Sequence, residues 1–422
     1  MNHFGYRNGV LHCEDVSLEA IARELGTPAY VYSDATLRRH YGVLAEAFAD
    51  RKVLIAYAVK ANSNLGVIAT LAALGAGADV VSGGELMKAM EAGVPADRIV
   101  FSGVGKTHDE MRLGLSRGIF QFNVESLPEL HRLSAVAQEM NLRAPVALRV
   151  NPHVEAGGHA HISTGTPETK FGIAWHEAEQ FYEVASRLPN IDPVGIAVHI
   201  GSQIMRVEPM RAAWEKVVTL TRRLRERGFG ITRVDFGGGL GVPYHDGEDP
   251  DSPTIYARQA REVLGNLDVQ LILEPGRLIS GNAGVLISRV EYVKERDGRT
   301  FVILDAGMND LMRPALYGAH HEVLPVRTPT MGAPRIAVDL VGPICESTDR
   351  FAKDRPMPPL KEGDLVAFMT AGAYGATLSS QYNSRPLVAE ALVRGDACVV
   401  VRRRPTFDEM IALERAPDWT AQ

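Results

Sequence analysis

The chain has 422 residues, of which 45% are hydrophobic and 23% charged, a balance that excludes wholesale disorder. Its formal net charge of -6 argues against nucleic acids and anionic membranes as partners. No apolar run reaches the roughly 18 residues of a membrane span, and the N-terminal segment lacks the apolar core of a signal peptide. Three scattered cysteines predict neither a disulfide framework nor a metal site. We therefore expect a cytoplasmic protein without a bound metal.

The chain begins with two hairpin-like strands, at 9–13 and 29–32, that do not belong to the pattern that follows them. Short apolar runs then alternate with longer helical patterns as far as residue 280, which is typical of βα units and a parallel sheet. We count eight strands, and eight such repeats predict a (β/α)8 barrel. An open doubly wound sheet is the alternative, although it usually has fewer strands. The predicted barrel strands are 53–59, 79–81, 99–102, 120–123, 146–150, 194–200, 233–236 and 269–273.

Beyond residue 281 the pattern changes to short β-rich runs separated by Gly, Pro and Asp turns. This predicts a mostly antiparallel β domain that is poor in helix until 407–414. The first strands of the chain are expected to pair with it, which would make that domain discontinuous. The predicted division is 1–28 for the N-terminal part of the β domain, 29–280 for the barrel and 281–422 for the rest of the β domain.

Unusual residues follow the predicted strands at their C-terminal ends, which is where barrel enzymes place their active sites. One unusual residue at a strand end would mean little. Six residues or runs at strand ends, all placed by the single assumption of a barrel, support a common site at its mouth. The residues and runs concerned are Lys60, Gly83-Gly84-Glu85, Asn151, His199 with Gly201-Ser202, Gly237–Gly241 and Glu274–Arg277.

A glycine run at 237–241 directly follows the seventh predicted strand. Missing Cβ atoms let backbone N–H groups approach an anion, and barrels often bind phosphate after strands seven and eight. Gly276 and Arg277 follow the eighth strand, and Ser202 could add a hydroxyl group. A glycine run by itself could be only a flexible turn. Together with the second loop, it predicts a phosphate site.

Lys60 ends a mostly apolar strand and is expected to point into the barrel mouth. Burial there would lower the pKa of the amine and suit it to Schiff-base formation, whereas an isolated strand-end lysine more often reaches solvent. An amine facing a phosphate cradle is what pyridoxal phosphate requires. Glu274 could then keep a pyridine nitrogen protonated, or it could simply pair with Arg277. His199 could stack on the ring, or it could be a hydrogen-bonded core residue.

Several motifs together resemble the diaminopimelate decarboxylases, which are fold-type III pyridoxal-phosphate enzymes. The resemblance covers nearly the whole chain, to about Arg404. Two of the motifs, HIGSQ and EPGR, are shared with ornithine and arginine decarboxylases, and the combination is more specific. The motifs are AYAVKANSN, HIGSQ, DFGGGLG, EPGR, DAGMNDLMRPALY, GPICESTD and AGAYG.

The resemblance implies a role for each matching residue. Lys60 would link to the cofactor, His199 would stack on it, and Glu274 would pair with its ring nitrogen. Cys345 would return a proton to the substrate carbon after carbon dioxide leaves. Further cofactor-binding residues would be Asp79, Arg149, Ser202, Gly238, Gly239, Gly276, Arg277 and Tyr374, and the substrate-binding residues would be Arg277, Arg313, Tyr317, Glu346 and Tyr374.

The substrate assignment also has a physical reason. Diaminopimelate carries a distal carboxylate that ornithine lacks, so its pocket needs cationic groups such as Arg313 and Arg277. Its distal amine needs an acidic group, which Glu346 would supply. The resemblance further implies a homodimer in which Cys345 and Glu346 complete the partner's active site.

Three other functions are weighed against this one. A related decarboxylase could act on ornithine, lysine or a carrier-bound amino acid, although Arg313 and Tyr317 favour diaminopimelate. A racemase on the same barrel tends to place arginine at the pyridine nitrogen, where this chain has Glu274. A regulatory homologue without cofactor would be expected to lose Lys60 or Cys345, and both are present.

Overall fold

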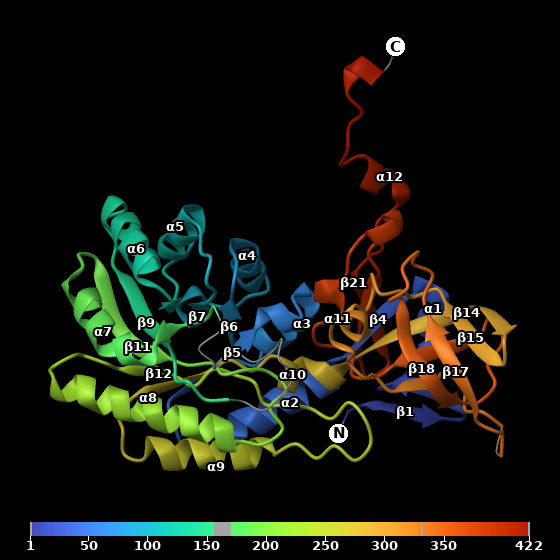
Figure 1. Ribbon diagram of the computed structural model, residues 1–422, viewed down its shortest axis with the longest axis horizontal. Coiled ribbons are helices and arrows are strands. Elements are labelled where there is room, and N and C mark those ends of the chain that lie inside the picture. Colours follow the sequence, from blue (N-terminus) through green and yellow to red (C-terminus); the bar gives the residue numbers. More distant parts are fainter. Residues whose placement is uncertain (1, 156–169, 331, 421–422) are drawn as a thin grey trace. The chain divides into compact units, whose positions relative to one another are not determined.

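The computed structural model describes residues 2–155, 170–330 and 332–420 (Figure 1). The chain divides into two compact units, which we call the barrel unit and the β unit. The barrel unit is Leu37–Gly281, and the β unit combines Met1–Thr36 with Asn282–Gln422. The predicted boundary at residue 28 and the observed one at residue 36 differ for a clear reason. Strand β4 (Ala29–Ser33) pairs with β14 (Gly284–Arg296) and with β20 (Ala389–Arg394), so it belongs to the β unit.

Eight parallel strands of the barrel unit close into a complete ring, because the last of them pairs with the first. This confirms the predicted (β/α)8 barrel and excludes the open sheet. A short additional strand, β10 (Ile173–Ala174), pairs only with β9. In order around the ring the strands are β5 (Val53–Ala58), β6 (Gly77–Val80), β7 (Ile99–Phe101), β8 (Gln121–Val124), β9 (Ala144–Asn151), β11 (Ile191–Ala197), β12 (Arg233–Asp235) and β13 (Gln270–Leu273).

Helices follow the strands and surround the ring (Figure 1). Several begin at a residue whose side chain accepts a hydrogen bond from the first turn, and each such cap contributes about 1 kcal/mol. Asn64, Ser82, Thr107, Ser126 and Ser252 act in this way. The caps fix where each strand-end loop becomes a helix. The helices are α2 (Asp34–Ala47), α3 (Leu65–Ala72), α4 (Gly83–Glu91), α5 (His108–Arg117), α6 (Leu127–Glu139), α7 (Ala178–Arg187), α8 (Glu208–Glu226), α9 (Pro253–Leu264) and α10 (Arg277–Ser280).

The inside of the ring changes from apolar to polar along the strands. Leu54, Ala56, Val100 and Ile272 form a buried cluster. Side chains two positions apart on a strand point to the same face. Glu274 therefore follows Ile272 on the inner face, at the C-terminal end of β13. The apolar cluster closes the ring beneath the polar residues at its mouth.

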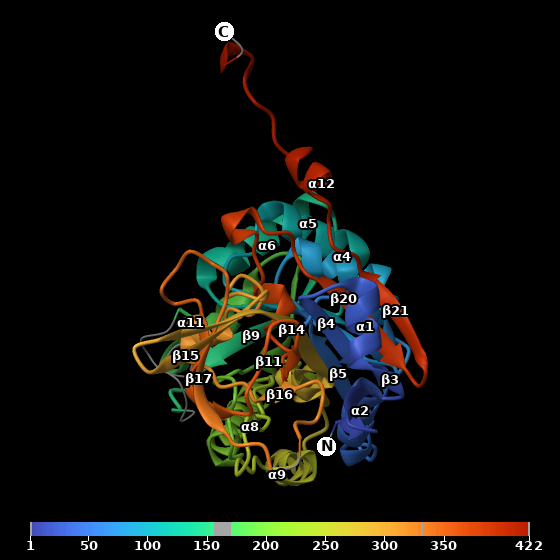
Figure 2. The ribbon, with the colours of Figure 1, turned by 90° about the vertical axis from the view of Figure 1, so that its right-hand side faces the viewer.

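The β unit is mostly antiparallel, with parallel pairs only at β4–β20 and at β15 (Arg299–Leu304) with β17 (Ile336–Val341) among the described strands. Strands β14, β4, β20 and β21 (Ala397–Arg402) are consecutive in one sheet (Figure 2). This confirms the predicted pairing for the strand at 29–32, whereas the strand at 9–13 lies in a separate three-stranded N-terminal sheet and pairs with the C-terminal part through an isolated bridge between Val10 and Arg327. The other elements are β1 (Phe4–Arg7), β2 (Val10–Cys13), β3 (Val16–Ser17), α1 (Leu18–Leu25), α11 (Arg313–Tyr317), β16 (Val323–Pro325), β18 (Arg350–Met357), β19 (Leu365–Phe368) and α12 (Phe407–Ile411).

The core of the β unit draws on segments from both ends of the chain. Leu11 and Ile21 pack with Val285, Ala367 and Val393 in one buried cluster. The N-terminal hairpin is thus part of this core and not an appendage. Within the described ranges of the chain, no helix is long and apolar enough to cross a membrane.

Candidate active site

The polar residues of the barrel unit gather at one end of the ring. Lys60 lies in a 3-10 turn (Val59–Ala61) directly after β5, and Asp79 lies near the end of β6. Arg149 lies near the end of β9, and Glu274 directly follows β13. Because all eight strands are parallel, these C-terminal ends meet at the same mouth. The structure therefore brings the predicted barrel residues into one region.

Lys60 and Asp79 form an ion pair across this mouth, with 2.6 Å between Nζ and Oδ2. The lysine side chain is 37% exposed, while that of Asp79 is completely buried. The lysine is thus held by an acid, in place of the apolar surroundings that the sequence suggested. The second oxygen of Asp79, Oδ1, has no hydrogen-bond partner among the described residues. A buried oxygen of this kind can accept a hydrogen bond from a bound molecule.

Glu274 is buried in a polar network between strands. Its Oε1 lies 3.2 Å from Nδ2 of Asn123 and 3.4 Å from Oγ of Ser102. Its carboxyl group is also hydrogen-bonded to that of Asp235. Burial first, and then the charges of Asp235 and Asp79, raise the pKa of Glu274 well above its usual range. A cation placed against it would favour the ionised form, so this pocket suits a positively charged ring nitrogen.

The glycine run at Gly237–Gly241 is fixed by close backbone packing. A Cβ atom on Gly238 would lie 2.1 Å from the carbonyl oxygen of Glu274. Gly239 has a φ of +113°, and a Cβ there would lie 2.4 Å from the carbonyl oxygen of Gly201. Only glycine permits these approaches. The run is therefore a rigid loop and not a flexible turn, as a backbone site for phosphate requires.

His199 is held beside this loop in its neutral form. Its Nδ1 accepts a hydrogen bond of 3.2 Å from the backbone N–H of Gly238. Burial first, and then the positive charges of Arg149 and Lys60, lower the pKa of His199 well below its usual range. A neutral ring whose Nδ1 accepts carries its proton on Nε2. The ring orientation is thus set by the glycine loop, which fits a residue that lies flat against a ligand.

Arg277 is buried at the start of α10, directly after Gly276. It donates a hydrogen bond from Nη1 to the hydroxyl group of Tyr244 and one of 3.2 Å from Nη2 to Oγ of Ser202. The predicted pair of Arg277 and Ser202 is thus in contact. Tyr244 was not predicted, although it lies only three residues beyond the glycine run.

Arg149 is held by an acid that the sequence did not identify. Its Nη1 lies 2.8 Å from Oε1 of Glu125, and its guanidinium group lies over the ring of Phe171, 5.0 Å from the centroid. The other oxygen of Glu125 accepts a hydrogen bond of 3.0 Å from the N–H of Gly172. Glu125 therefore fixes the position of Arg149 from the end of β8.

The other five predicted residues lie in the β unit. Arg313 is buried at the start of α11, with 2.8 Å between its Nη1 and Nε2 of His321. Since Nδ1 of His321 lies 2.9 Å from the carbonyl oxygen of Met369 and can donate to it, Nε2 is left to accept from the arginine. The buried arginine is thus oriented by a histidine. Tyr317 closes the same short helix and is partly exposed.

Cys345 and Glu346 lie on the surface of their own chain, in the loop between β17 and β18. The loop is wrapped around buried Asp349, whose Oδ2 accepts a hydrogen bond of 2.6 Å from the N–H of Ile344. The backbone N–H of Cys345 donates to Oδ1 of Asn383, at 3.0 Å. Both side chains are therefore presented outward by an ordered loop.

Tyr374 lies in the loop after β19 and has a φ of +55°, an unfavourable conformation for a residue with a side chain. The next residue explains how the loop is fixed. A Cβ on Gly375 would lie 2.5 Å from the carbonyl oxygen of Ala371 and 2.7 Å from the hydroxyl group of Tyr30. Tight packing at the glycine holds the tyrosine in its strained conformation, which is often a mark of a functional position.

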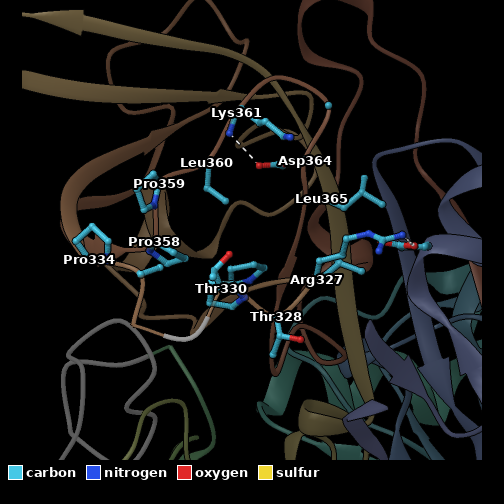
Figure 3. Close-up of a pocket in the computed structure, with 16 residues that line it drawn as sticks. Arg327, Thr328, Thr330, Pro334, Pro358, Pro359, Leu360, Lys361, Asp364 and Leu365 are labelled. Atoms are coloured by element: carbon cyan, nitrogen blue, oxygen red, sulfur yellow. Dashed lines mark hydrogen bonds and ion pairs between the residues drawn. The ribbon is translucent and has the colours of Figure 1, made fainter. Parts of the chain in front are cut away.

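A hollow of about 510 Å³ lies elsewhere in the β unit, among proline-rich loops (Figure 3). Its ionisable side chains are Glu19, Arg327, Lys361 and Asp364, of which Glu19 and Arg327 pair with each other. Its lining includes neither a thiol nor a histidine. We assign no chemistry to it. Among the described residues, no cluster of histidine, cysteine and carboxylate side chains is arranged to hold a metal ion.

Comparisons with known proteins agree on one family. Residues 34–281 match the profile described as "Pyridoxal-dependent decarboxylase, pyridoxal binding domain". A diaminopimelate decarboxylase of Pseudomonas aeruginosa is 51% identical over 414 residues, covering 98% of this chain and 99% of the relative. One of Vibrio cholerae is 48% identical over 416 residues, with the same coverage.

Solved structures give the same result. A diaminopimelate decarboxylase of Helicobacter pylori, complexed with L-lysine, superposes with a TM-score of 0.90 at 40% identity and covers 94% of this chain and 98% of that one. The enzyme of M. jannaschii, in complex with L-lysine, gives a TM-score of 0.93 at 34% identity and covers 99% of both chains. The similarity thus extends over both units of the fold.

Proposed function

The chain belongs to the pyridoxal-dependent decarboxylase family, and on this premise we propose that it is a diaminopimelate decarboxylase. It would convert meso-2,6-diaminopimelate into L-lysine and carbon dioxide, the last step of lysine biosynthesis. The observation that carries this proposal is the barrel mouth, where a lysine, a buried acid and a rigid glycine loop meet. Relatives named for this reaction are 51% and 48% identical to it over almost the full length of the chain.

The residues of the mouth fit pyridoxal phosphate as the cofactor. The glycine loop has no room for side chains, as close approach of a phosphate requires. Oδ1 of Asp79 can accept a hydrogen bond from the cofactor. The pKa of Glu274 is raised, and a positively charged ring nitrogen beside it would stabilise its ionised form. When bound, the cofactor supplies an electron sink for the electron pair that decarboxylation leaves behind. Lys60 would hold the cofactor's aldehyde, and Gly238, Gly239, Gly276, Arg277 and Ser202 would hold its phosphate.

Each side chain of the mouth would then have a distinct task. Glu274 would hold a proton at the ring nitrogen, and Asp79 would orient Lys60 and the ring. His199, neutral and fixed through Nδ1, would lie against the ring face without adding charge to it. Arg149 would support the ring edge from its place beside Glu125. Tyr374 would contact both cofactor and substrate.

The substrate's distal end carries both an amine and a carboxylate, so its pocket needs groups of both charges. We propose that Arg313, Arg277 and the Tyr317 hydroxyl group bind the carboxylate and that Glu346 binds the amine. The support within the β unit is the fixed orientation of Arg313 through His321. An oriented guanidinium group loses little entropy when it pairs with a carboxylate.

We further propose a homodimer in which Cys345 and Glu346 complete the site of the partner subunit. The support is that both side chains are exposed on an ordered loop of their own chain. Exposed apolar residues of the C-terminal segment, among them Phe407, Ile411 and Leu413, are also of the kind that a subunit interface covers. Cys345 would deliver the proton that replaces the lost carboxyl group. All three cysteines are free thiols, which fits the cytoplasm as the location.

The direct test is to incubate the purified protein with meso-diaminopimelate and measure carbon dioxide and L-lysine. Ornithine, lysine and the other diaminopimelate stereoisomers serve as comparison substrates. We expect carbon dioxide to be released from meso-diaminopimelate and from none of the comparison substrates. Preference for ornithine or lysine would show that the protein is a related decarboxylase with a different substrate. Interconversion of stereoisomers without carbon dioxide would indicate a racemase.

Replacing Arg313 with leucine is expected to impair the reaction with diaminopimelate much more than any residual reaction with ornithine. Losing a charge-assisted hydrogen bond costs about 1.5–3 kcal/mol, or more if a buried carboxylate is left unpaired. The quantity to measure is kcat/KM for both substrates, beside Arg335→Leu as an exposed arginine control. Equal losses on both substrates would show that Arg313 only supports the fold.

A further inference from the structure

Asp235 is a buried acid at the mouth that has no role in the proposal so far. It ends β12 and is 1% exposed. Its Oδ1 accepts a hydrogen bond of 2.8 Å from the N–H of Gly237, the first residue of the glycine loop. Its Oδ2 lies 3.1 Å from Nδ2 of Asn123, the same amide nitrogen that lies 3.2 Å from Glu274. Asp235 is therefore in contact with both the phosphate loop and the proposed partner of the ring nitrogen.

The carboxyl groups of Asp235 and Glu274 meet at Nδ2 of Asn123, 3.1 and 3.2 Å away, and a hydrogen bond between these two neighbouring acids requires one of them to carry a proton. Burial raises the pKa of Asp235 to about 6. The pKa of Glu274 is raised well above its usual range, and the mutual hydrogen bond raises it further. The other groups acting on the pair are Asp79 and Lys60 at the mouth, with Tyr256 of α9 also within electrostatic range.

We propose that Asp235 is a positioning residue that shares one proton with Glu274 and ties that carboxyl group to the glycine loop. The proposal deepens the function given above, because it rests on Glu274 and the loop being the two ends of one cofactor site. The shared proton keeps two adjacent buried acids from both being negative, which low-dielectric surroundings would strongly oppose. Gly237 is held by the same carboxylate that orients Glu274. The two ends of the site are thus set by a single side chain.

The chain offers a matched control in Asp310 of the β unit. Its Oδ2 accepts a hydrogen bond of 2.9 Å from the N–H of Gly307, and its Oδ1 accepts one of 2.9 Å from Nδ2 of Asn309. Burial raises the pKa of Asp310 to about 7. Asp310→Asn therefore removes a buried acid that has a similar set of partners but makes no hydrogen bond with Glu274.

The first experiment follows the melting temperature of the full-length, cofactor-free protein with pH. A carboxyl group with a raised folded pKa binds more protons in the folded state than in the unfolded state. Stability is therefore lost as pH rises from about 4, the usual pKa of an acid, through the raised value. Asp235→Asn and Glu274→Gln are each expected to reduce this loss of stability. The double variant should reduce it by less than the sum of the two single effects, because the two acids titrate as a coupled pair.

The effect of Asp310→Asn on the pH dependence of the melting temperature is expected to add in full to that of each of these variants, since Asp310 titrates independently of the pair. Full additivity between Asp235→Asn and Glu274→Gln would show two separate acids and overturn the shared proton. This readout needs neither cofactor nor activity. It therefore decides the proposal even if the protein proves to catalyse a different reaction.

The second experiment measures the dissociation constant of pyridoxal phosphate by equilibrium dialysis. Asp235→Asn is expected to weaken binding roughly 10- to 100-fold, the usual effect of losing one hydrogen bond to a charged group. Asp310→Asn is expected to bind like the wild type. Wild-type affinity in Asp235→Asn, or equal weakening in both variants, contradicts the positioning role. Failure of the wild-type protein to bind the cofactor would contradict the proposed function itself.

Discussion

Replacing Lys60 with alanine is expected to abolish the visible absorption of bound pyridoxal phosphate and nearly all turnover. The amine is the only group at the mouth proposed to attach the cofactor covalently, and it is already placed there by Asp79 at 2.6 Å. Positioning of this kind supplies a large share of catalytic rate, so the loss should exceed that of any other substitution considered. Absorption spectra and decarboxylation rates of the purified variant measure both effects.

Two further variants separate the chemical role of Lys60 from its ion pair. Lys60→Arg keeps the positive charge beside Asp79 but cannot attach to an aldehyde, so it should be as inactive as the alanine variant. Lys88→Ala removes an exposed lysine of α4 that donates to the carbonyl oxygen of Ser63, and it should retain both absorption and activity. Wild-type absorption in Lys60→Ala, or substantial activity in Lys60→Arg, would refute the assignment.

Replacing Cys345 with alanine is expected to slow turnover by roughly 10²- to 10⁴-fold while the cofactor still binds. That range is the usual contribution of a positioned acid or base. The thiol is proposed to act only after carbon dioxide leaves, so cofactor absorption should be unchanged. Cys398→Ala provides the thiol control, because Cys398 lies on β21 and burial raises its pKa.

Mixing the two inactive variants tests whether the site is shared between subunits. In a heterodimer of Lys60→Ala and Cys345→Ala chains, one site would hold both native residues and the other would hold neither. If half of the dimers are mixed and each has one good site, about one quarter of the wild-type activity returns. Exchange of subunits is verified by mass-tagged chains. Exchange without recovery of activity would mean that Cys345 acts within its own chain.

The barrel could be predicted from the sequence because its signal is local. Each strand is a short buried run followed by a capped helix, as in β6 followed by Ser82 and α4. The boundary near residue 28 could not be placed from the same signal. The segment AYVYS of β4 is fully buried, and the predicted boundary lies before it although the strand lies outside the βα pattern. Its pairing with β14 and with β20, which lies some 360 residues later in the chain, assigns it to the β unit.

The site was predictable where a residue is unusual in its surroundings, such as Lys60 after an apolar strand. Residues that hold others in place were missed, among them Asp235, Asn123 and Glu125. A usable signal was present, because Asn123 and Asp235 are polar residues near the ends of otherwise buried strands. What no pattern could reveal is that one amide nitrogen lies within 3.2 Å of two acids.

The position of β4 also bears on the synthesis of the chain. A ribosome releases residues 37–281 before β14 or β20 exists, so the barrel can form while β4 still has no strand to pair with. Domains generally fold as they emerge, and an unpaired apolar strand is prone to aggregation until its neighbours arrive. The nascent N-terminal segment therefore has to stay unpaired until most of the chain has been translated. Messages truncated before β20 should yield polypeptides that depend on chaperones or are degraded.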